Sequence, residues 1–327
     1  MVFYLDMDLR YLRFAAILGL SAAAACLTGA AFGAARVELY QTTASAADRS
    51  DAAQTAAFQA ALKVVLVRVT GRRTVNDDPV FEPLFRDARR YVQQYRSVSD
   101  NQVWVAFDGP AIERWLTQNG QPLWGRERPA TLVWLSVQSG PQAETVLTAD
   151  SGSGLKAAID AAAAMRAIPL IWPSAAVQEG EPADIAHRLG AEGVLIGRAN
   201  NAAATANVRW TLVYQDRSSE FSGSVEGVNR AADLYAGLLA ASGGVAPVDI
   251  EVSGIGDLRD YAAAQTYLES QTYITHVSVQ AMSGDTVKFR LTTRGGIEPL
   301  QHANSLNGRL QSLPAGDNGI QRFQLRR

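Results

Sequence analysis

The chain has 327 residues, of which 47% are hydrophobic and 19% are charged, and its formal net charge is -2. This composition is typical of globular proteins and argues against collagen, coiled coils and multi-span membrane proteins. The near-neutral charge excludes a strongly basic nucleic-acid-binding protein, so we expect no nucleic-acid partner. A single cysteine can form neither an internal disulfide nor a cysteine-based metal site, and we expect no cofactor.

The N-terminal 35 residues are predicted to be an export signal. Arg10 and Arg13 precede an uncharged, alanine-rich run over 14–35, and small residues at its end place the cleavage after Ala35. Two alternatives stay open. The run is long enough to remain as a membrane anchor of about 20 residues, and Cys26 could carry a lipid, although the large aliphatic residue usual three positions earlier is missing. We therefore predict a periplasmic protein that meets the membrane only if the signal is retained.

The first domain, residues 36–128, is predicted to be α+β. Its clearest element is a helix over 51–70, whose apolar residues recur with helical spacing and which Gly71 ends. The other predicted elements are a strand over 37–40, a helix from Asp78-Pro79 through Tyr95, a strand over 102–107 and a helix capped by Asp108.

The second domain, residues 129–246, is predicted to contain a mixed sheet covered by helices. Strands alternate with helices and are followed by a hairpin whose turn spans 216–219. The predicted elements are strand 131–137, helix 155–166, strand 169–172, helix 182–189, strand 193–197, hairpin strands 208–215 and 220–228, and helix 230–241.

The third domain, residues 247–327, is predicted to have the order β-α-β-β-α-β, the ferredoxin-like arrangement. The predicted elements are strand 248–253, helix 257–269, strands 273–280 and 286–293, helix 296–304 and strand 320–325. Because many unrelated proteins use this arrangement, it indicates little about function. The expected fold class is thus α+β in three small domains.

Seven short segments, taken in order, form a specific set. They are 61–72 (ALKVVLVRVTGR), 91–96 (YVQQYR), 104–108 (WVAFD), 122–125 (PLWG), 128–129 (RP), 134–135 (WL) and 193–198 (GVLIGR). Together they resemble the bacterial family called domain of unknown function 2066 (DUF2066). The resemblance covers most of the chain after the signal. It implies an exported protein of Gram-negative bacteria with no assigned activity, and it supplies no catalytic residues.

One serine motif could carry chemistry. Ser153 and Lys156 match Ser-x-x-Lys, in which the lysine can take the proton of the serine in acyl-transferring enzymes. The partner motifs Ser-Asp-Asn and Lys-Thr-Gly are missing. We interpret Ser153 as the cap of the following helix, with Lys156 pointing to solvent. No catalytic residue is therefore predicted.

The histidines show no metal-binding pattern. His187, His276 and His302 lie in different predicted elements, and no pair has the spacing of a zinc motif. We predict no metal site.

Two tryptophans flank an arginine at the first domain junction. Trp124, Arg128 and Trp134 could bind a sugar or a peptidoglycan strand. We favour the alternative that they join two domains, because a buried tryptophan offers a large apolar area. In a separate part of the sequence, Arg68, Arg72 and Arg73 could touch anionic lipid or complement the end of the first helix.

The sequence thus favours a non-enzymatic envelope protein, a scaffold or adaptor that binds another, unknown envelope protein through free sheet edges. The first alternative is a periplasmic binding module for a cell-wall or small ligand at Trp124, Arg128 and Trp134. The second is an acyl-serine hydrolase.

Overall fold

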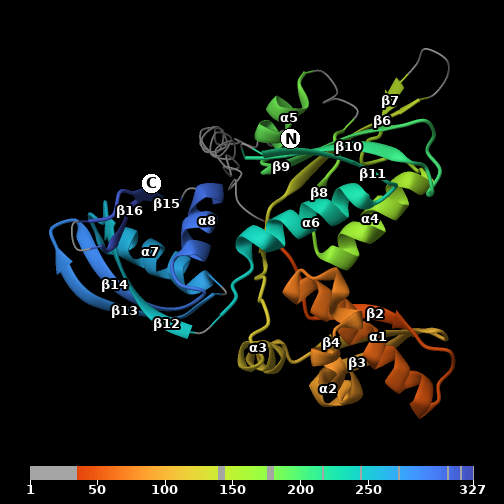
Figure 1. The fold of residues 1–327 in the computed structure, drawn as a ribbon, viewed down its shortest axis with the longest axis horizontal. Helices are drawn as coiled ribbons and strands as arrows, with labels where there is room; N and C mark the ends of the chain where they lie inside the picture. The colour runs from red at the N-terminus through yellow and green to blue at the C-terminus, as the bar shows by residue number, and fades with distance from the viewer. Residues whose placement is uncertain are drawn as a thin grey trace, which may run out of the picture. The chain divides into compact units, whose positions relative to one another are not determined.

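The computed structural model describes residues 35–138, 144–174, 180–215, 217–243, 245–271, 273–307, 309–316 and 319–326. The predicted export signal and Cys26 lie outside these residues, except that Ala35 and Arg36 form the short strand β1 (Ala35–Arg36), which pairs with β5 (Glu127–Arg128). The predicted cleavage after Ala35 would therefore cut within β1. The described chain is an α+β protein, as predicted (Figure 1).

The first region contains a three-stranded sheet in the order β2-β4-β3, with α1 packed against it. α1 has the predicted bounds. Its N-cap, which was not predicted, is Ser50, whose Oγ accepts from the Ala53 N–H. Gly71 ends the helix as predicted, with a φ of 73°. This φ is in the left-handed region that favours glycine. The elements are β2 (Gln41–Ser45), α1 (Asp51–Thr70), β3 (Val92–Ser99), β4 (Gln102–Phe107) and α3 (Gly109–Gln118), the last capped by Asp108 as predicted.

Two predictions for this region are wrong. The first strand lies at β2 rather than over 37–40. The predicted helix from Asp78 through Tyr95 is instead a series of short turns, η2 (Pro79–Phe81), α2 (Glu82–Arg86) and η3 (Ala88–Tyr91), followed by β3. Another short turn, η1 (Arg73–Asp77), precedes them. Tyr95 is 49% exposed, so its spacing from the earlier aromatic residues does not reflect a buried helix face. Pairing with β4 decides the conformation here.

Among the described residues, α1 is the one helix whose length and composition would allow it to cross a membrane. Its residues Leu62, Val65 and Leu66 are fully buried in the first hydrophobic cluster. We interpret α1 as the core helix of this region.

The central sheet has the order β11-β10-β9-β6-β7, and β8 also pairs with β6. It is mixed, as predicted, because β6 pairs in parallel with β8 and β9 while the other pairs are antiparallel. Its strands are β6 (Thr131–Gln138), β7 (Glu144–Val146), β8 (Leu170–Ile171), β9 (Gly193–Ala199), β10 (Val208–Tyr214) and β11 (Arg217–Ser222), and its helices are α4 (Gly154–Arg166), α5 (Pro182–Leu189) and α6 (Glu226–Leu239).

The hairpin has a tighter turn than predicted. Tyr214 pairs with Arg217, so only residues 215 and 216 separate the two strands, and Gln215 has a φ of 52°. The second strand therefore starts at Arg217 and ends at Ser222, before the predicted 228.

The two faces of the central sheet are covered unequally. Val133, Leu135 and Val137 of β6 lie in the large cluster formed with α4 and α6. Leu132 and Trp134 point to the opposite face, where α5 contributes Ile185 and Ala186 to a small cluster. Figure 1 shows α4 and α6 on one side of the sheet and α5 alone on the other. We name this second side the open face.

The C-terminal sheet has the order β13-β14-β12-β16-β15. The ferredoxin-like prediction is not confirmed, because a strand that we did not predict, β15, lies at one edge and its hairpin partner β16 pairs in parallel with β12. The elements are β12 (Val245–Ser253), α7 (Leu258–Ser270), β13 (Ile274–Ser283), β14 (Thr286–Arg294), α8 (Glu298–Asn307), β15 (Leu310–Leu313) and β16 (Gln321–Leu325).

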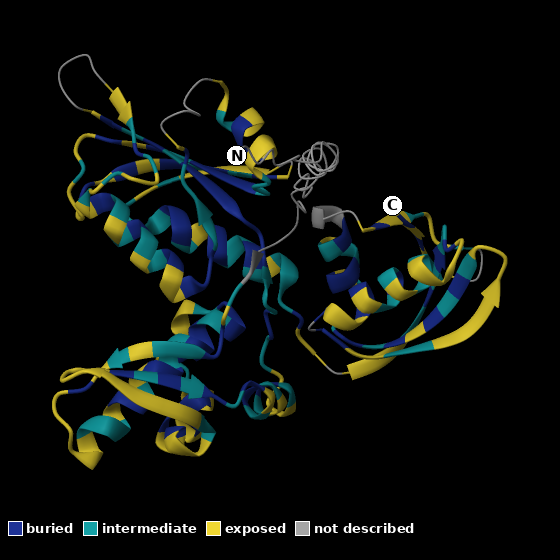
Figure 2. Cartoon of the chain, turned by 180° about the vertical axis from the view of Figure 1, so that it is seen from behind, coloured by how far each residue is buried: buried dark blue, intermediate teal, exposed yellow. Residues whose placement is uncertain are grey.

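Residues 33–327 form one compact unit. Within the described chain, buried apolar side chains form three large clusters, drawn from 39–123 with Ala167, from 124–235 and from 241–325. Figure 2 shows the buried strands of the central sheet in dark blue and long exposed stretches on the outer strands.

Candidate functional site

The structure brings together two of the three predicted junction residues. Trp124 is 1% exposed and Arg128 is fully buried. The guanidinium carbon of Arg128 lies 3.4 Å from the centre of the Trp124 ring, the geometry of a cation–π contact.

Arg128 also binds the C-terminal end of α1. Its Nη2 donates to the carbonyl oxygens of Arg68 at 2.8 Å and Trp124 at 3.0 Å. The backbone N–H of Trp124 donates to the carbonyl of Val69 at 2.6 Å. The last carbonyls of a helix have no partner within the helix and carry the negative end of its dipole, so a cation here satisfies them and is itself stabilised.

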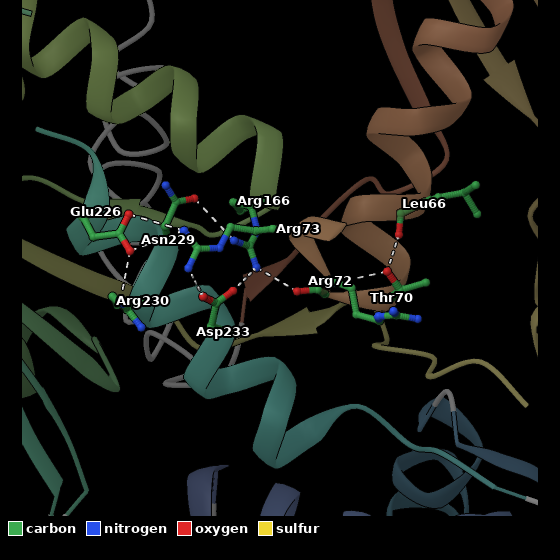
Figure 3. A network of polar contacts seen from close by, with 10 residues as sticks. Leu66, Thr70, Arg72, Arg73, Arg166, Glu226, Asn229, Arg230 and Asp233 are labelled. Atoms are coloured by element: carbon green, nitrogen blue, oxygen red, sulfur yellow. Dashed lines mark hydrogen bonds and ion pairs between the residues drawn. The ribbon is translucent and has the colours of Figure 1, made fainter. Parts of the chain in front are cut away.

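A second arginine reaches the same helix end from α4. Arg166 Nη2 donates to the carbonyl of Gly71 and to Asp233 Oδ1, both at 2.8 Å. Arg73 binds the other oxygen of Asp233 at 2.6 Å. Figure 3 shows Arg166 and Arg73 directed at Asp233 of α6, which ties the ends of α1 and α4 to α6. We name this cluster at the end of α1, which is formed by Trp124, Arg128, Arg166 and Asp233, the arginine junction.

The predicted basic group has partners within the protein. Arg68 donates to the carbonyls of Ala164 and Gln41, and Arg72 pairs with Asp78 at 2.7 Å. Together with the Arg73 contacts, these bonds give each of the three arginines a partner within the protein near the end of α1.

Burial of the junction has an electrostatic cost. It lowers the pKa of the Arg128 guanidinium well below its ordinary value, and the nearby Arg166 and Arg68 act in the same direction, while Tyr40 acts against them. Nε and Nη1 of Arg128 have no hydrogen-bond partner in the described part of the chain. The junction is closely packed, because a Cβ on Gly71 would lie 2.2 Å from Ala236 Cβ.

The third predicted residue lies elsewhere. Trp134 is half-buried on the open face, where its position on β6 pairs with Ile196 of β9. Successive side chains of a strand point to opposite faces, and the buried side of β6 faces the junction. Trp134 is therefore not part of a Trp124/Arg128 cluster.

A cavity of about 500 Å³ lies on the central sheet near Trp134. Its lining includes Ile196, Arg198, Arg209, Thr211, Glu220 and Ser222. Arg198 of β9 pairs directly with Arg209 of β10, and both are exposed. Within the described residues neither arginine forms an ion pair. The reasoning from sequence missed this site, although each arginine interrupts an otherwise apolar strand and could have marked an exposed position.

The Ser-x-x-Lys motif is placed partly as predicted. Ser153 Oγ accepts from the Lys156 N–H at 3.1 Å and caps α4. The expectation that Lys156 points to solvent is wrong, because its side chain is 15% exposed and Nζ binds Asp160 at 2.8 Å. Nζ also lies 5.1 Å from the centre of the Trp172 ring. These contacts hold the Lys156 amine beside Asp160.

The histidines are separate. His187 is in α5, His276 in β13 and His302 in α8, where His302 Nδ1 lies 2.8 Å from the carbonyl of Leu238. In the described ranges no group of three His, Cys, Asp or Glu residues could hold a metal ion.

One buried carboxyl group was not predicted. Burial, with a smaller contribution from Glu127, raises the pKa of Glu192 to about 7. Neither carboxyl oxygen has a hydrogen-bond partner among the residues described. Glu192 immediately precedes β9, and it helps burial to raise the pKa of Tyr214 on β10.

Residues 34–125 match the family model described as Domain of unknown function (DUF8605). The predicted resemblance to DUF2066 is therefore wrong, because the matching model belongs to a different domain of unknown function. Comparison with curated proteins and with solved structures finds no match to the chain.

Proposed function

We propose that this chain is an exported adaptor that binds another protein by adding a strand to the free edge of the central sheet at β11. The observation that supports it is the regular, exposed β11 edge beside the open face. Strand addition supplies main-chain hydrogen bonds for affinity and side-chain pockets for specificity.

β11 pairs with β10 over all six of its residues without a register shift. Gly223 N–H donates to the Val208 carbonyl just beyond this ladder. Alternate residues of an antiparallel strand turn their N–H and C=O groups toward the partner. Because Gly223 turns its N–H toward β10, every second residue from Ser222 backward turns these groups away from β10. These residues are Ser222, Glu220 and Ser218, and a further strand can bind their outward groups.

The other long edge strands are less regular. β3 and β13 each carry two irregularities in their pairing, and bulges at an edge hinder pairing with another chain. The edge strands β2, β7 and β15 have five, three and four residues. β11 is therefore the edge best suited to strand addition.

The alternatives have weaker support. A ligand site at the first junction would need access to Trp124 and Arg128, which are buried and hydrogen-bonded to α1. An acyl-serine mechanism would need the Lys156 amine at Ser153, whereas Nζ binds Asp160.

Site-specific photo-crosslinking in cells tests the adaptor proposal. We expect a crosslinker in place of Ser222 to form one reproducible, stoichiometric protein adduct. Ser218→Pro removes an outward N–H without removing a bond to β10, so it should abolish this adduct. Ser218→Thr keeps the N–H and is the matched control. Adducts that form equally in both variants would contradict strand addition.

The export and domain predictions remain part of this proposal. We expect the mature protein in the periplasmic fraction with Arg36 as its first residue, which N-terminal sequencing would establish. Recovery of the full-length chain in the cytoplasm would contradict export. We also propose domain boundaries after Arg128 and after Ala246. Because Arg128 is fully buried whereas Ser242 and Gly243 are exposed, limited proteolysis should cut the chain near the second boundary.

A further inference from the structure

We propose that the cavity on the open face binds a carboxylate of the partner segment, so that the adaptor selects an extended segment with an acidic residue opposite Ser222. This inference rests on the proposed strand addition at β11 and adds the chemistry of the partner.

The first argument is the charge of the cavity. Arg198 and Arg209 pair directly across β9 and β10, and like charges directly opposite each other destabilise a sheet. Glu220 is the one acidic residue among those that line the cavity, and its position pairs with Thr211 rather than with either arginine. A carboxylate that reaches Arg209 from the β11 side would reduce the repulsion and accept a charge-assisted hydrogen bond.

The second argument is the register of the strands. Ser136, Arg198, Arg209 and Ser222 form a row across β6, β9, β10 and β11 through direct pairs. A strand added outside β11 would extend this row by one residue. Neighbouring strands lie about 4.8 Å apart, and the small Ser222 leaves the long Arg209 side chain room to reach across it. The residue opposite Ser222 is therefore the residue of the added strand that lies nearest Arg209.

The third argument comes from Glu220. Its side chain lies on the same face as that of Ser222, because the two residues are two positions apart on β11. A second acidic residue of the partner, opposite Glu220, would be repelled. One acidic residue with neutral or basic neighbours on its face fits the surface better than a uniformly anionic partner such as a lipid headgroup layer.

Fluorescence anisotropy with two labelled peptides tests this inference. Both are nine-residue peptides of alternating Thr and Val, and they differ only in a central Glu or Gln. We expect the Glu peptide to bind the full chain about tenfold more tightly, the effect of a charge-assisted hydrogen-bond pair. This preference should disappear in Arg198→Gln/Arg209→Gln and weaken at high salt.

Two control variants make the result specific. Arg217→Gln removes the same charge from β11 on the opposite face and should keep the preference. Ser222→Glu places a carboxylate of the protein itself beside Arg209, and this variant should lose the preference for the Glu peptide. All four positions are exposed, so we expect none of these variants to unfold at a lower temperature than the wild type.

The outcomes separate the two proposals. Equal binding of the Glu and Gln peptides, with both weakened by Ser218→Pro, would overturn the acidic preference and leave strand addition standing. A Glu preference that survives Ser218→Pro would support the arginine site and contradict strand addition. Binding of phosphatidylglycerol vesicles through Arg198 and Arg209, without binding of either peptide, would overturn this inference in favour of a membrane surface.

Discussion

Two pairs of arginines in this protein have opposite surroundings. Arg128 and Arg166 are almost fully buried in the arginine junction and donate to carbonyls at the end of α1. Arg198 and Arg209 are exposed on the open face and face each other across two strands. The same side chain therefore serves as an internal cap in one region and is solvent-exposed in the other, where we propose that it binds a partner.

The difference shows why burial and partners decide the role of an arginine. The junction arginines are held by backbone carbonyls, Asp233 and the Trp124 ring, so substitutions there should affect folding. The open-face arginines have long, solvated side chains and no ion pair among the described residues, so substitutions there should affect binding and leave folding unchanged.

The largest expected effect is at Arg128. Arg128→Ala leaves a cavity and two carbonyls without their donor, and we expect the free energy of unfolding to fall by about 4 kcal/mol. Arg209→Ala should change it by no more than about 0.5 kcal/mol. Urea unfolding of both variants measures the contrast. Arg128→Met keeps most of the volume, and wild-type stability in that variant would contradict a role for the carbonyl bonds.

The next effect is at Gly71, the close contact between α1 and α6. Gly71→Ala adds a Cβ that would lie 2.2 Å from Ala236 Cβ, at a φ of 73°. We expect a loss of about 3 kcal/mol from the clash and the left-handed conformation. Gly237→Ala is the control, because nothing lies within 4 Å of its added Cβ, and it should stabilise α6 by about 0.5 to 1 kcal/mol. Similar Tm values for both variants would show that the junction is loosely packed.

Buried and exposed carboxyl groups can be compared in the same way, and Glu192 is the buried one. Its pKa rises from 4.5 to about 7 in the folded protein, so between these values the folded state binds the proton more tightly than the unfolded state. The contribution of Glu192 to the free energy of unfolding is fully present below about pH 4.5. This contribution falls by at most about 3 kcal/mol as the pH rises to 7.

Glu192→Gln removes this titration. We expect the variant to be more stable than the wild type at pH 8 and to lose that advantage as the pH falls toward 5. Glu220→Gln, on the exposed edge strand, is the matched control for the loss of a carboxylate. Thermal unfolding at several pH values measures both, and a parallel pH profile for Glu192→Gln and the wild type would contradict the raised pKa.

The smallest effect is at Ser153. Ser153→Ala removes the N-cap of α4, the helix that carries Arg166, and should cost about 1 kcal/mol. Ser153→Asp keeps the cap and should restore stability. Loss of function in cells with a normal amount of folded Ser153→Ala would instead favour a chemical role for the hydroxyl.

The sequence alone was sufficient where a few neighbouring residues decide the structure. Gly71 ends α1, Asp108 caps α3, and Ser153 caps α4, as predicted. These caps depend on hydrogen bonds between residues three or four positions apart, so their signals lie within the local sequence.

Tertiary structure decided what depends on distant residues. Pairing with β4 makes β3 a strand, and the parallel pairing of β16 with β12, together with the added strand β15, changes the C-terminal sheet. The row from Ser136 to Ser222 arises only when β6, β9, β10 and β11 come together. Local propensity carries no information about register between strands far apart in the chain, so the candidate binding site became visible only in the folded sheet.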